Sequence, residues 1–211
     1  MIVCVIGPSA AGKSTLAKRL EGRHPQLFAR VPADYFFVPR RDQPLEDYLA
    51  VPLAYDWDAV DRALARSGPE RSTPDCDFER FVRRSDDGGL PINDAPVHVL
   101  DGMRAHPRCD LVVLLELDRT EQRRRLVERD TRWGSRVADR EPHLDATFAA
   151  GCAELPRKPD LRLSATAPIE ANASRVIDAI YADGRRPGAR AVPQGCCRSS
   201  GIEPIDGGAG V

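Results

Sequence analysis

The fold of this chain is decided by residues 2–15, which read IVCVIGPSAAGKST. The run Ile2-Val3-Cys4-Val5-Ile6 is uninterrupted and rich in β-branched residues, which predicts a strand buried on both faces. Residues 7–15 then match the pattern G-x-x-x-x-G-K-[ST], and residues 16–20 begin a predicted helix. Because this motif requires a strand before it and a helix after it, the stretch predicts a loop that binds the phosphates of a nucleoside triphosphate.

Each part of this loop has a chemical task. The glycines at its two ends, Gly7 and Gly12, permit tight turns and a close approach to a ligand. Backbone N–H groups of the loop and of the helix start attract anions. Lys13 is expected to reach the β- and γ-phosphates, and the Ser14 hydroxyl is expected to bind Mg²⁺. The residues expected to bind the nucleotide here are Gly7, Ser9, Ala10, Ala11, Gly12, Lys13, Ser14 and Thr15.

The composition narrows the class of protein. With 211 residues, of which 42% are hydrophobic, the chain can bury one substantial core. A net charge of −1 gives no general attraction to nucleic acid or to an anionic membrane surface, so neither is expected as a partner. The six cysteines show no C-x-x-C spacing, which indicates neither a zinc site nor a disulfide framework. No apolar run is long enough to span a membrane, so a cytoplasmic location is expected.

The rest of the chain predicts alternating strands and helices. Further strands are expected at 28–31, 97–100, 111–117 and 161–164, and helices at 13–22, 57–66, 76–84, 119–130, 143–153 and 169–182. Such alternation is typical of an α/β fold, here a three-layer α/β/α P-loop NTPase with a five-stranded parallel sheet. We expect one domain over 1–183, with a helical substrate-binding insertion at 38–95 and a lid at 119–140. Residues 184–211, rich in glycine, proline and serine, are expected to form a disordered tail.

Two acidic residues follow predicted strands, at the sheet edge where ligands of such folds bind. Asp34 comes after the strand at 28–31, where its carboxylate could accept the proton of an attacking hydroxyl. Asp101 ends the strand at 97–100, where it could hold Mg²⁺ together with Ser14. The alternative interpretation of each acid is a residue that forms a turn.

An arginine-rich helix follows the strand at 111–117. Its arginines at steps of three and four residues are Arg125, Arg129, Arg132 and Arg136. One helical face could carry them all. Guanidinium groups stabilise the charge of a transferring phosphoryl group, and a lid excludes water. We assign this role to Arg129 and Arg132, and we expect Arg123 and Arg124 to pair with acids on a solvated face.

The insertion holds the residues expected to contact an acceptor substrate. Asp56 could bind substrate hydroxyls, while Arg80 or Arg83 could bind an anionic substituent. The aromatic residues Trp57 and Phe78 are expected to form the core of a small helical cap.

The order of these residues resembles the uridine kinase family and its relatives, which include nicotinamide riboside kinases, pantothenate kinases and phosphoribulokinases. The resemblance rests on Asp34-Tyr35-Phe36, Tyr55-Asp56-Trp57-Asp58, Asp77-Phe78, Asp101-Gly102, Arg129-Asp130 with Arg132 and Gly134, and Ser164-Ala165-Thr166-Ala167-Pro168. It implies that Asp34 is the catalytic base, with Tyr35 beside it at the substrate, and that Asp56 contacts sugar hydroxyls. It also implies that the loop containing Thr166 borders the adenine of the nucleotide.

The sequence departs from the uridine kinase pattern where that family reads its base. Cys76 stands in place of a tyrosine, and Phe81 lies near the position of a base-reading histidine. A thiol and a phenyl ring offer few hydrogen-bonding groups to a pyrimidine. The acceptor is therefore left open among a ribosyl compound with another base, a pantothenate-like molecule and a hydroxylated natural product such as an antibiotic.

Together these features predict a kinase that uses ATP and Mg²⁺ to phosphorylate a hydroxyl group of a small molecule. The predicted catalytic residues are Lys13, Asp34, Arg129 and Arg132. One alternative is a nucleoside monophosphate kinase, which would need an arginine cluster for the acceptor phosphate. The candidates for such a cluster are Arg40, Arg41, Arg80, Arg83 and Arg84. The other alternative is a regulatory switch that binds a nucleoside triphosphate with little turnover.

Overall fold

The computed structural model of this chain describes residues 1–66, 68–155 and 157–182. The tail predicted at 184–211 lies outside the described residues. A central five-stranded sheet contains β1 (Ile2–Ile6), β2 (Phe28–Pro32), β5 (Val97–Gly102), β6 (Leu111–Glu116) and β7 (Leu161–Ser164). Its order is β2-β5-β1-β6-β7, and neighbouring strands are parallel. This confirms the predicted α/β fold and the five predicted strands.

Strand β1 occupies the middle of the sheet and pairs with β5 on one side and β6 on the other. Its side chains alternate between the two faces, as strand geometry requires. Val3 and Val5 belong to one buried cluster, whereas Cys4 and Ile6 belong to the other. The loop after Ile6 therefore leaves the sheet at the carboxyl end of its central strand, where α/β sheets bind their ligands.

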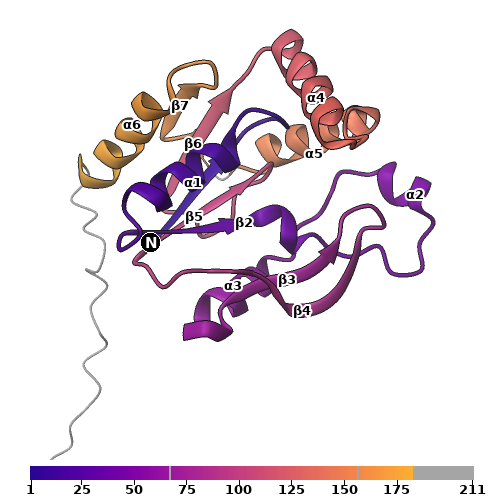
Figure 1. The fold of residues 1–211 in the computed structure, drawn as a ribbon, viewed down its shortest axis with the longest axis horizontal. Coiled ribbons are helices and arrows are strands. Elements are labelled where there is room, and N and C mark those ends of the chain that lie inside the picture. The colour runs from indigo at the N-terminus through magenta and orange to yellow at the C-terminus, as the bar shows by residue number, and fades with distance from the viewer. Residues whose placement is uncertain (67, 156, 183–211) are drawn as a thin grey trace, which may run out of the picture.

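Helices cover both faces of the sheet (Figure 1). Helices α1 (Lys13–Arg23) and α6 (Ile169–Ala182) pack on the face of Val3 and Val5. Helices α3 (Trp57–Ala65) and α5 (Glu141–Ala153) supply apolar side chains to the opposite face. Fully buried side chains such as Leu16 and Leu20 each contribute about 1.5–3 kcal/mol of hydrophobic stabilisation. The result is the predicted three-layer arrangement.

The insertion at 38–95 is the part of the fold that the sequence analysis described wrongly. It contains α2 (Leu45–Leu49), α3 and the short helix η2 (Gly68–Glu70), but also two strands, β3 (Ser72–Asp77) and β4 (Val82–Pro91). These strands form an antiparallel hairpin, and the helix predicted at 76–84 does not exist. Figure 1 shows this hairpin beside α3, below the carboxyl edge of the sheet.

The turn of the hairpin explains this error. The Asp77 side chain accepts hydrogen bonds from the backbone N–H groups of Glu79 and Arg80, both at 3.1 Å. Such local bonds compete with a helix and favour a turn. Phe81 then adopts a left-handed backbone with φ of 52°, which returns the chain into β4. The helix predicted at 76–84 therefore does not form, because the Asp77 side chain binds the backbone of the two residues that follow Phe78.

Two further elements complete the carboxyl edge of the sheet. The short helix η1 (Ala33–Phe36) follows β2, and α4 (Arg119–Trp133) follows β6. Another short helix, η3 (Ala138–Arg140), joins α4 to α5. No helix among the described residues combines the length and the apolar character that crossing a lipid bilayer demands.

Candidate active site

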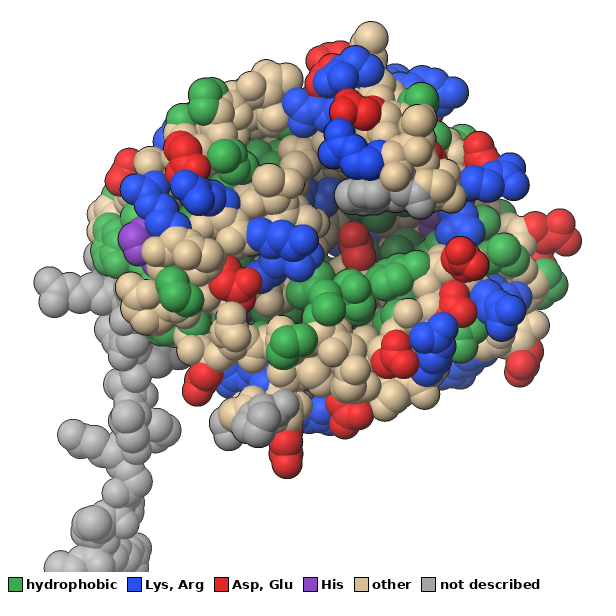
Figure 2. Space-filling model, viewed as in Figure 1, with side chains coloured by type: hydrophobic (Ala, Val, Ile, Leu, Met, Phe, Trp, Pro, Cys, Tyr) green, Lys and Arg blue, Asp and Glu red, His purple; other side chains and the backbone are tan. Residues whose placement is uncertain are grey.

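A cavity of about 390 Å³ lies over the loop that follows β1, and we call it the loop cavity. It is lined by Ser9, Ala10, Gly12, Lys13, Ser14, Thr15, Asp34, Arg125, Glu128, Arg129 and Arg132. Figure 2 shows a hollow in the centre of this face, with basic side chains gathered on the rim that α4 forms and hydrophobic side chains on the opposite rim. The predicted phosphate-binding loop and the predicted arginine helix thus face each other across one cavity.

The loop backbone has the conformation that anion binding requires. Ala10 and Gly12 adopt left-handed backbones with φ of 64° and 86°, a conformation that lets neighbouring N–H groups point into one concavity. Helix α1 begins directly after Gly12 with no side-chain cap and no acidic residue in its first turn. Its free N–H groups and partial positive charge are therefore left for a ligand.

Two residues of the predicted nucleotide site, Gly7 and Ala11, have packing contacts in the structure. Gly7 does not line the loop cavity, and a Cβ atom at this position would lie 2.7 Å from the backbone oxygen of Leu115. Ala11 is buried in the core between β1 and α1. They shape the loop without lining the cavity.

Lys13 is buried, and its Nζ atom donates a hydrogen bond to the backbone oxygen of Pro8 at 2.8 Å. No carboxylate of the described residues lies within ion-pair distance of it. Burial lowers the pKa of Lys13, and the charges of Asp34 and Asp101 oppose that shift. A buried ammonium group held only by a loop carbonyl fits a site for an anionic ligand.

Asp34 lies on η1 and lines the loop cavity. Its Oδ1 atom accepts a hydrogen bond of 2.5 Å from the Tyr55 hydroxyl group. Tyr55 is buried and stacks on Trp57 with ring centroids 5.1 Å apart. Burial, followed by the nearby Asp34, raises the pKa of Tyr55 well above its usual value, so the hydroxyl remains a donor. Nothing in the sequence indicates this pair, because its members are 21 residues apart.

Asp101, the predicted magnesium ligand, is the penultimate residue of β5 and is 2% exposed. Arg30 on β2 holds both of its oxygens, through Nε at 3.0 Å and a terminal nitrogen at 3.2 Å. Burial raises the pKa of Asp101, while Arg30 and the Ser14 hydroxyl act in the opposite direction. The sequence analysis missed Arg30, which lies 71 residues from its partner. No cluster of three or more His, Cys, Asp or Glu side chains is placed to hold a metal ion within the described ranges.

Helix α4 brings three arginines to the loop cavity, and each has a different environment. Arg125 donates to the backbone oxygens of Ala10 and Ala165, which fastens α4 to the phosphate loop. Arg132 pairs with Glu128 at 3.1 Å and is exposed. Arg129 has a buried Nε atom without a hydrogen-bond partner. Burial lowers the pKa of Arg129, and the charges of Asp130 and Asp34 oppose that shift.

The predicted solvated face of α4 is paired with acids. Arg123 contacts Glu141 on α5, and Arg124 contacts Glu121 and Glu128 on its own helix. The pairs of Arg124 are largely exposed and contribute little to stability, whereas the partner of Arg123, Glu141, is buried. They agree with the expectation that Arg123 and Arg124 lie outside the site.

A second cavity of about 280 Å³ adjoins the first, and we call it the apolar cavity. It shares Ser9, Lys13, Asp34 and Arg129 with the loop cavity. Its other lining residues are Phe37, Leu53, Phe78, Phe81, Met103, Val137, Arg140, His143 and Leu144. Because these residues come from six separate parts of the chain, no sequence motif could reveal the cavity.

The predicted acceptor contacts other than Asp34 line neither of these two cavities. Asp56 caps α3 by accepting from the Ala59 N–H group at 2.9 Å, and it pairs with Arg83 at 3.1 Å. Arg80 is exposed, and Tyr35 packs edge-on against Phe78. None of these four residues therefore lines the two cavities with Asp34, and Asp56 and Arg83 are engaged with each other instead.

Thr166 likewise does not line the loop cavity. It is exposed, and its hydroxyl group shares a hydrogen bond of 2.8 Å with that of Ser164. Its neighbour Ala165 is the residue that contacts the site, through the carbonyl group that accepts from Arg125.

The hairpin is held against the site by side chains that cross from β3 and β4. Arg83 donates to the backbone oxygen of Phe37 at 2.9 Å as well as to Asp56. The Cys76 thiol donates to the backbone oxygen of Tyr35 at 3.1 Å. These contacts position the hairpin tip, where Phe78 and Phe81 enter the apolar cavity. Phe78 is 39% exposed there, so it is not the core residue that the sequence analysis expected.

The fold and the site define this chain as an α/β protein with a loop suited to binding phosphate at the carboxyl edge of its parallel sheet. Among proteins of known sequence, it is 28% identical to a uridine kinase of Halobacterium salinarum over 140 residues, which is 60% of each chain. The chain thus spans about 60% of the length of that curated relative. No protein-family model matches the sequence.

Solved structures share the fold. One is described provisionally as a fructose transport system kinase of Silicibacter sp. TM1040, with a TM-score of 0.53, 20% identity, and coverage of 77% of this chain and 88% of that one. Another is described as a possible uridine kinase of Bacillus stearothermophilus, with a TM-score of 0.47, 17% identity, and the same coverage of 77% and 88%. The likeness to the first structure confirms the predicted fold, and the sequence relative agrees with the resemblance to uridine kinases.

Proposed function

We propose that this chain transfers the γ-phosphoryl group of ATP to a hydroxyl group of a small molecule. One observation carries the proposal: Asp34 lies where the loop cavity and the apolar cavity meet, with Lys13 and Arg129 beside it in both. Phosphoryl transfer needs phosphate-binding groups, a group that accepts the proton of the attacking hydroxyl, and a space for the acceptor. These three requirements coincide at Asp34.

In this proposal the loop N–H groups, Lys13, Arg129 and Arg132 bind the phosphates and stabilise the charge of the transferring group. Asp34 orients the acceptor hydroxyl and takes its proton, and Tyr55 holds the Asp34 carboxylate in place through its hydrogen bond. Residues 119–140 act as the lid over both cavities, because α4 lines both of them and Arg140 of η3 lines the apolar cavity.

Ser14 and Asp101 are the residues that would hold Mg²⁺. Both offer oxygen atoms, which Mg²⁺ prefers, and the ion commonly keeps several waters and substrate phosphate oxygens as further ligands. Because Arg30 already engages both Asp101 oxygens, we expect Asp101 to hold the ion through water rather than directly. When bound, the ion would neutralise charge on the phosphates.

The two alternative functions have less support. A monophosphate acceptor would need an arginine cluster in the insertion. Among the described residues of 38–95, however, those that line the apolar cavity are Leu53, Phe78 and Phe81, and its two arginines, Arg129 and Arg140, belong to the lid. A switch with little turnover would not need a carboxylate positioned by a buried tyrosine. An alcohol acceptor makes use of both observations.

The test is the variant Asp34→Asn, measured by ADP release from ATP and Mg²⁺ with nucleosides, nucleoside monophosphates, nicotinamide riboside, pantothenate and hydroxylated antibiotics as acceptors. Loss of the proton acceptor should lower kcat about 10²–10⁴-fold while nucleotide affinity is kept. Asp47→Asn, an exposed acid on α2, is the matched control and should behave like the parent protein. Unchanged turnover in Asp34→Asn would remove the base role and favour a monophosphate acceptor.

A further inference from the structure

The apolar cavity has a composition that restricts what the acceptor can be. Away from Asp34, its walls are formed largely by Phe37, Phe78, Phe81, Met103 and Leu144. These five side chains offer no strong hydrogen-bond partner to the hydroxyl groups of a polyol or a sugar, so the polar groups of the cavity are confined to Ser9, Lys13, Asp34, Arg129, Arg140 and His143. Each polar group buried there without a partner would cost about 1–3 kcal/mol. An apolar body of a ligand would instead gain from leaving water.

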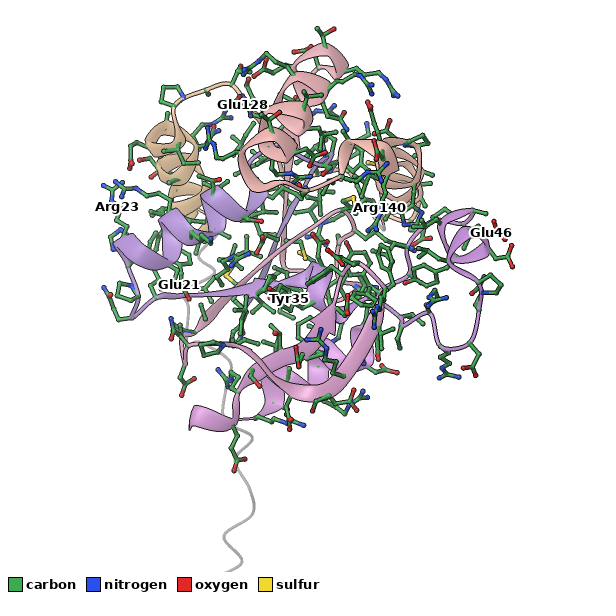
Figure 3. The ribbon with its side chains drawn as sticks, turned by 45° about the vertical axis from the view of Figure 1, so that its right-hand side comes forward. Glu21, Arg23, Tyr35, Glu46, Glu128 and Arg140 are labelled. Atoms are coloured by element: carbon green, nitrogen blue, oxygen red, sulfur yellow. The ribbon has the colours of Figure 1, made fainter. Side chains whose placement is uncertain are left out.

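Arg140, a polar side chain beside the aromatic walls of the apolar cavity, already has hydrogen-bond partners in the protein. Arg140 on η3 donates to the backbone oxygens of Phe78 at 3.1 Å and Glu79 at 3.4 Å, and its guanidinium lies 5.2 Å from the centre of the Phe81 ring. Figure 3 shows Arg140 on the side of the lid that faces the insertion, which carries the labelled Glu46. Its donors connect η3 to the hairpin tip, so an anionic substituent would have to compete with that connection.

His143 is engaged in a similar way. Its Nδ1 atom lies 3.0 Å from the backbone oxygen of Leu49, and since a carbonyl oxygen only accepts, Nδ1 is the protonated nitrogen. Burial lowers the pKa of His143, which favours the neutral ring. A neutral ring gives a carboxylate or phosphate no cation at this position. The Nε2 atom of His143 is buried without a hydrogen-bond partner, so it leaves one acceptor for a single polar group of the ligand.

Phe81, one of the aromatic residues that line the apolar cavity, has a strained backbone conformation. Phe81 is 7% exposed and has φ of 52°, a conformation that disfavours residues other than glycine. Its ring contacts Phe37, Tyr48 and His143 at centroid distances of 5.7, 5.1 and 6.2 Å. Strain of about 1–3 kcal/mol at such a residue is typical of functional sites. The turn holds a phenyl ring in the cavity at the expense of local backbone stability.

We propose that the acceptor is an alcohol with an uncharged, largely apolar body, such as one aromatic or alicyclic ring system. Its hydroxyl group would reach Asp34, and its body would lie among Phe37, Phe78 and Phe81. The volume of about 280 Å³ lies just below the usual range for small-molecule sites, which suits a compact molecule. This inference rests on the proposed function and names the substrate class of the same site.

The test is a binding measurement that does not depend on turnover. The full chain is saturated with Mg²⁺ and a nonhydrolysable ATP analogue, and calorimetry or ligand-observed NMR then compares benzyl alcohol, hydroxymethylbenzoate and xylitol. Benzyl alcohol should bind at least about tenfold more tightly than the other two, because only its body matches the apolar walls. Equal affinity for all three, or tighter binding of the carboxylate or the polyol, would overturn the inference.

A pair of variants assigns the selectivity to the cavity wall. Phe78 and Leu90 lie on the same hairpin and are similarly exposed, at 39% and 37%, but only Phe78 lines the apolar cavity. Phe78→Ala should weaken benzyl alcohol binding about five- to tenfold and leave xylitol unaffected. Leu90→Ala should change neither. An unchanged affinity in Phe78→Ala, or equal losses in the two variants, contradicts the proposal.

Turnover of the same compounds separates this inference from the proposed function. Selective binding of benzyl alcohol without ADP release would contradict the kinase proposal and leave the character of the apolar cavity standing. ADP release with polyols but not with apolar alcohols would support the kinase proposal and overturn this inference.

Discussion

The loop cavity and the apolar cavity share an edge but are built in different ways. Six of the residues that line the loop cavity come from one segment, 9–15, and its ligand groups include backbone N–H donors. The apolar cavity is built from side chains that reach it from distant segments, among them Phe37, Phe81, Met103 and Leu144. Phosphate can be recognised by one short, locally ordered segment, whereas an acceptor is recognised by side chains that only packing assembles.

The two cavities meet at Ser9, Lys13, Asp34 and Arg129, and this shared edge is where we propose the reaction takes place. The comparison predicts that substitutions in the loop cavity lower kcat most. Substitution of the tyrosine that binds Asp34 should lower kcat without changing KM. Substitutions behind the apolar cavity should raise KM for the acceptor.

The largest effect is expected for Lys13→Met, which removes the buried ammonium group and keeps a side chain of similar length. We expect kcat to fall about 10³-fold because the charge of the transferring group loses a stabilising cation. Acceptor binding should change by less than about threefold, since the apolar walls remain. Steady-state ADP release and calorimetry measure the two effects.

Lys18→Met is the matched control for this variant, because Lys18 is exposed on the same helix and lines neither cavity. It should keep parental activity. A Lys13→Met protein with parental turnover would contradict the role of the loop cavity in catalysis.

An intermediate effect is expected for Tyr55→Phe, which deletes the hydroxyl group that donates to Asp34. Hydrogen bonds to charged groups contribute about 1.5–3 kcal/mol, so kcat should fall roughly 10–100-fold. KM for ATP and for the acceptor should stay within about threefold, because neither cavity loses a wall. Steady-state kinetics with each substrate varied in turn provide the measurement.

Tyr48→Phe separates positioning of Asp34 from a general effect on packing. Tyr48 belongs to the same buried cluster, but its hydroxyl group donates to the backbone oxygen of Val38 at 2.6 Å. Tyr48→Phe should lower the free energy of unfolding by about 1 kcal/mol and leave kcat unchanged. Equal losses of kcat in both variants would show that Tyr55 acts through stability alone.

The smallest effect on catalysis is expected for Arg83→Met, which frees the hairpin from Phe37 and leaves Asp56 without its buried partner. Unfolding free energy should fall by about 2 kcal/mol. KM for the acceptor should rise about three- to tenfold, while KM for ATP should not change, because only the apolar cavity depends on the hairpin. Urea unfolding and steady-state kinetics test both parts.

Arg84→Met is the control on the neighbouring position of β4. Arg84 is 59% exposed and pairs with Asp75 and Asp77 at the surface, so its loss should cost less than about 0.5 kcal/mol. If Arg83→Met raised KM for ATP and KM for the acceptor equally, this would contradict the claim that the hairpin supports the apolar cavity alone.

Features of the fold that neighbouring residues specify could be predicted from the sequence, whereas a feature that depends on side-chain contacts could not. Strands β1 and β6 were recognised as contiguous apolar runs, and the phosphate loop was recognised because its motif is contiguous too. The other three strands are short apolar stretches interrupted by Arg30, His98 and Arg162. The helix predicted at 76–84 was wrong because the Asp77 side chain bonds the backbone of Glu79 and Arg80 and so favours a turn. Patterns of apolar spacing carry no information about that competition.

The candidate site shows the same division. Asp34 and Asp101 were located because each directly follows or ends an apolar strand, and the sheet carries both to its carboxyl edge. Their partners, Tyr55 and Arg30, were missed because the two members of each pair are far apart in the sequence. Tyr55 lies 21 positions from Asp34, Arg30 lies 71 positions from Asp101, and no rule of spacing connects such residues. Asp56 and Arg83 were assigned to the substrate because the sequence could not reveal that they bind each other.

By itself, then, the sequence determined the central sheet, the phosphate-binding loop and the position of the two acids, because local apolar runs and one contiguous motif specify them. Only the tertiary structure decided which side chains hold those acids and what surrounds the acceptor. The Tyr55–Asp34 and Arg30–Asp101 bonds and the aromatic walls of the apolar cavity arise from segments that pack together after the chain has folded. Their identity depends on distance in space, which spacing along the chain does not encode.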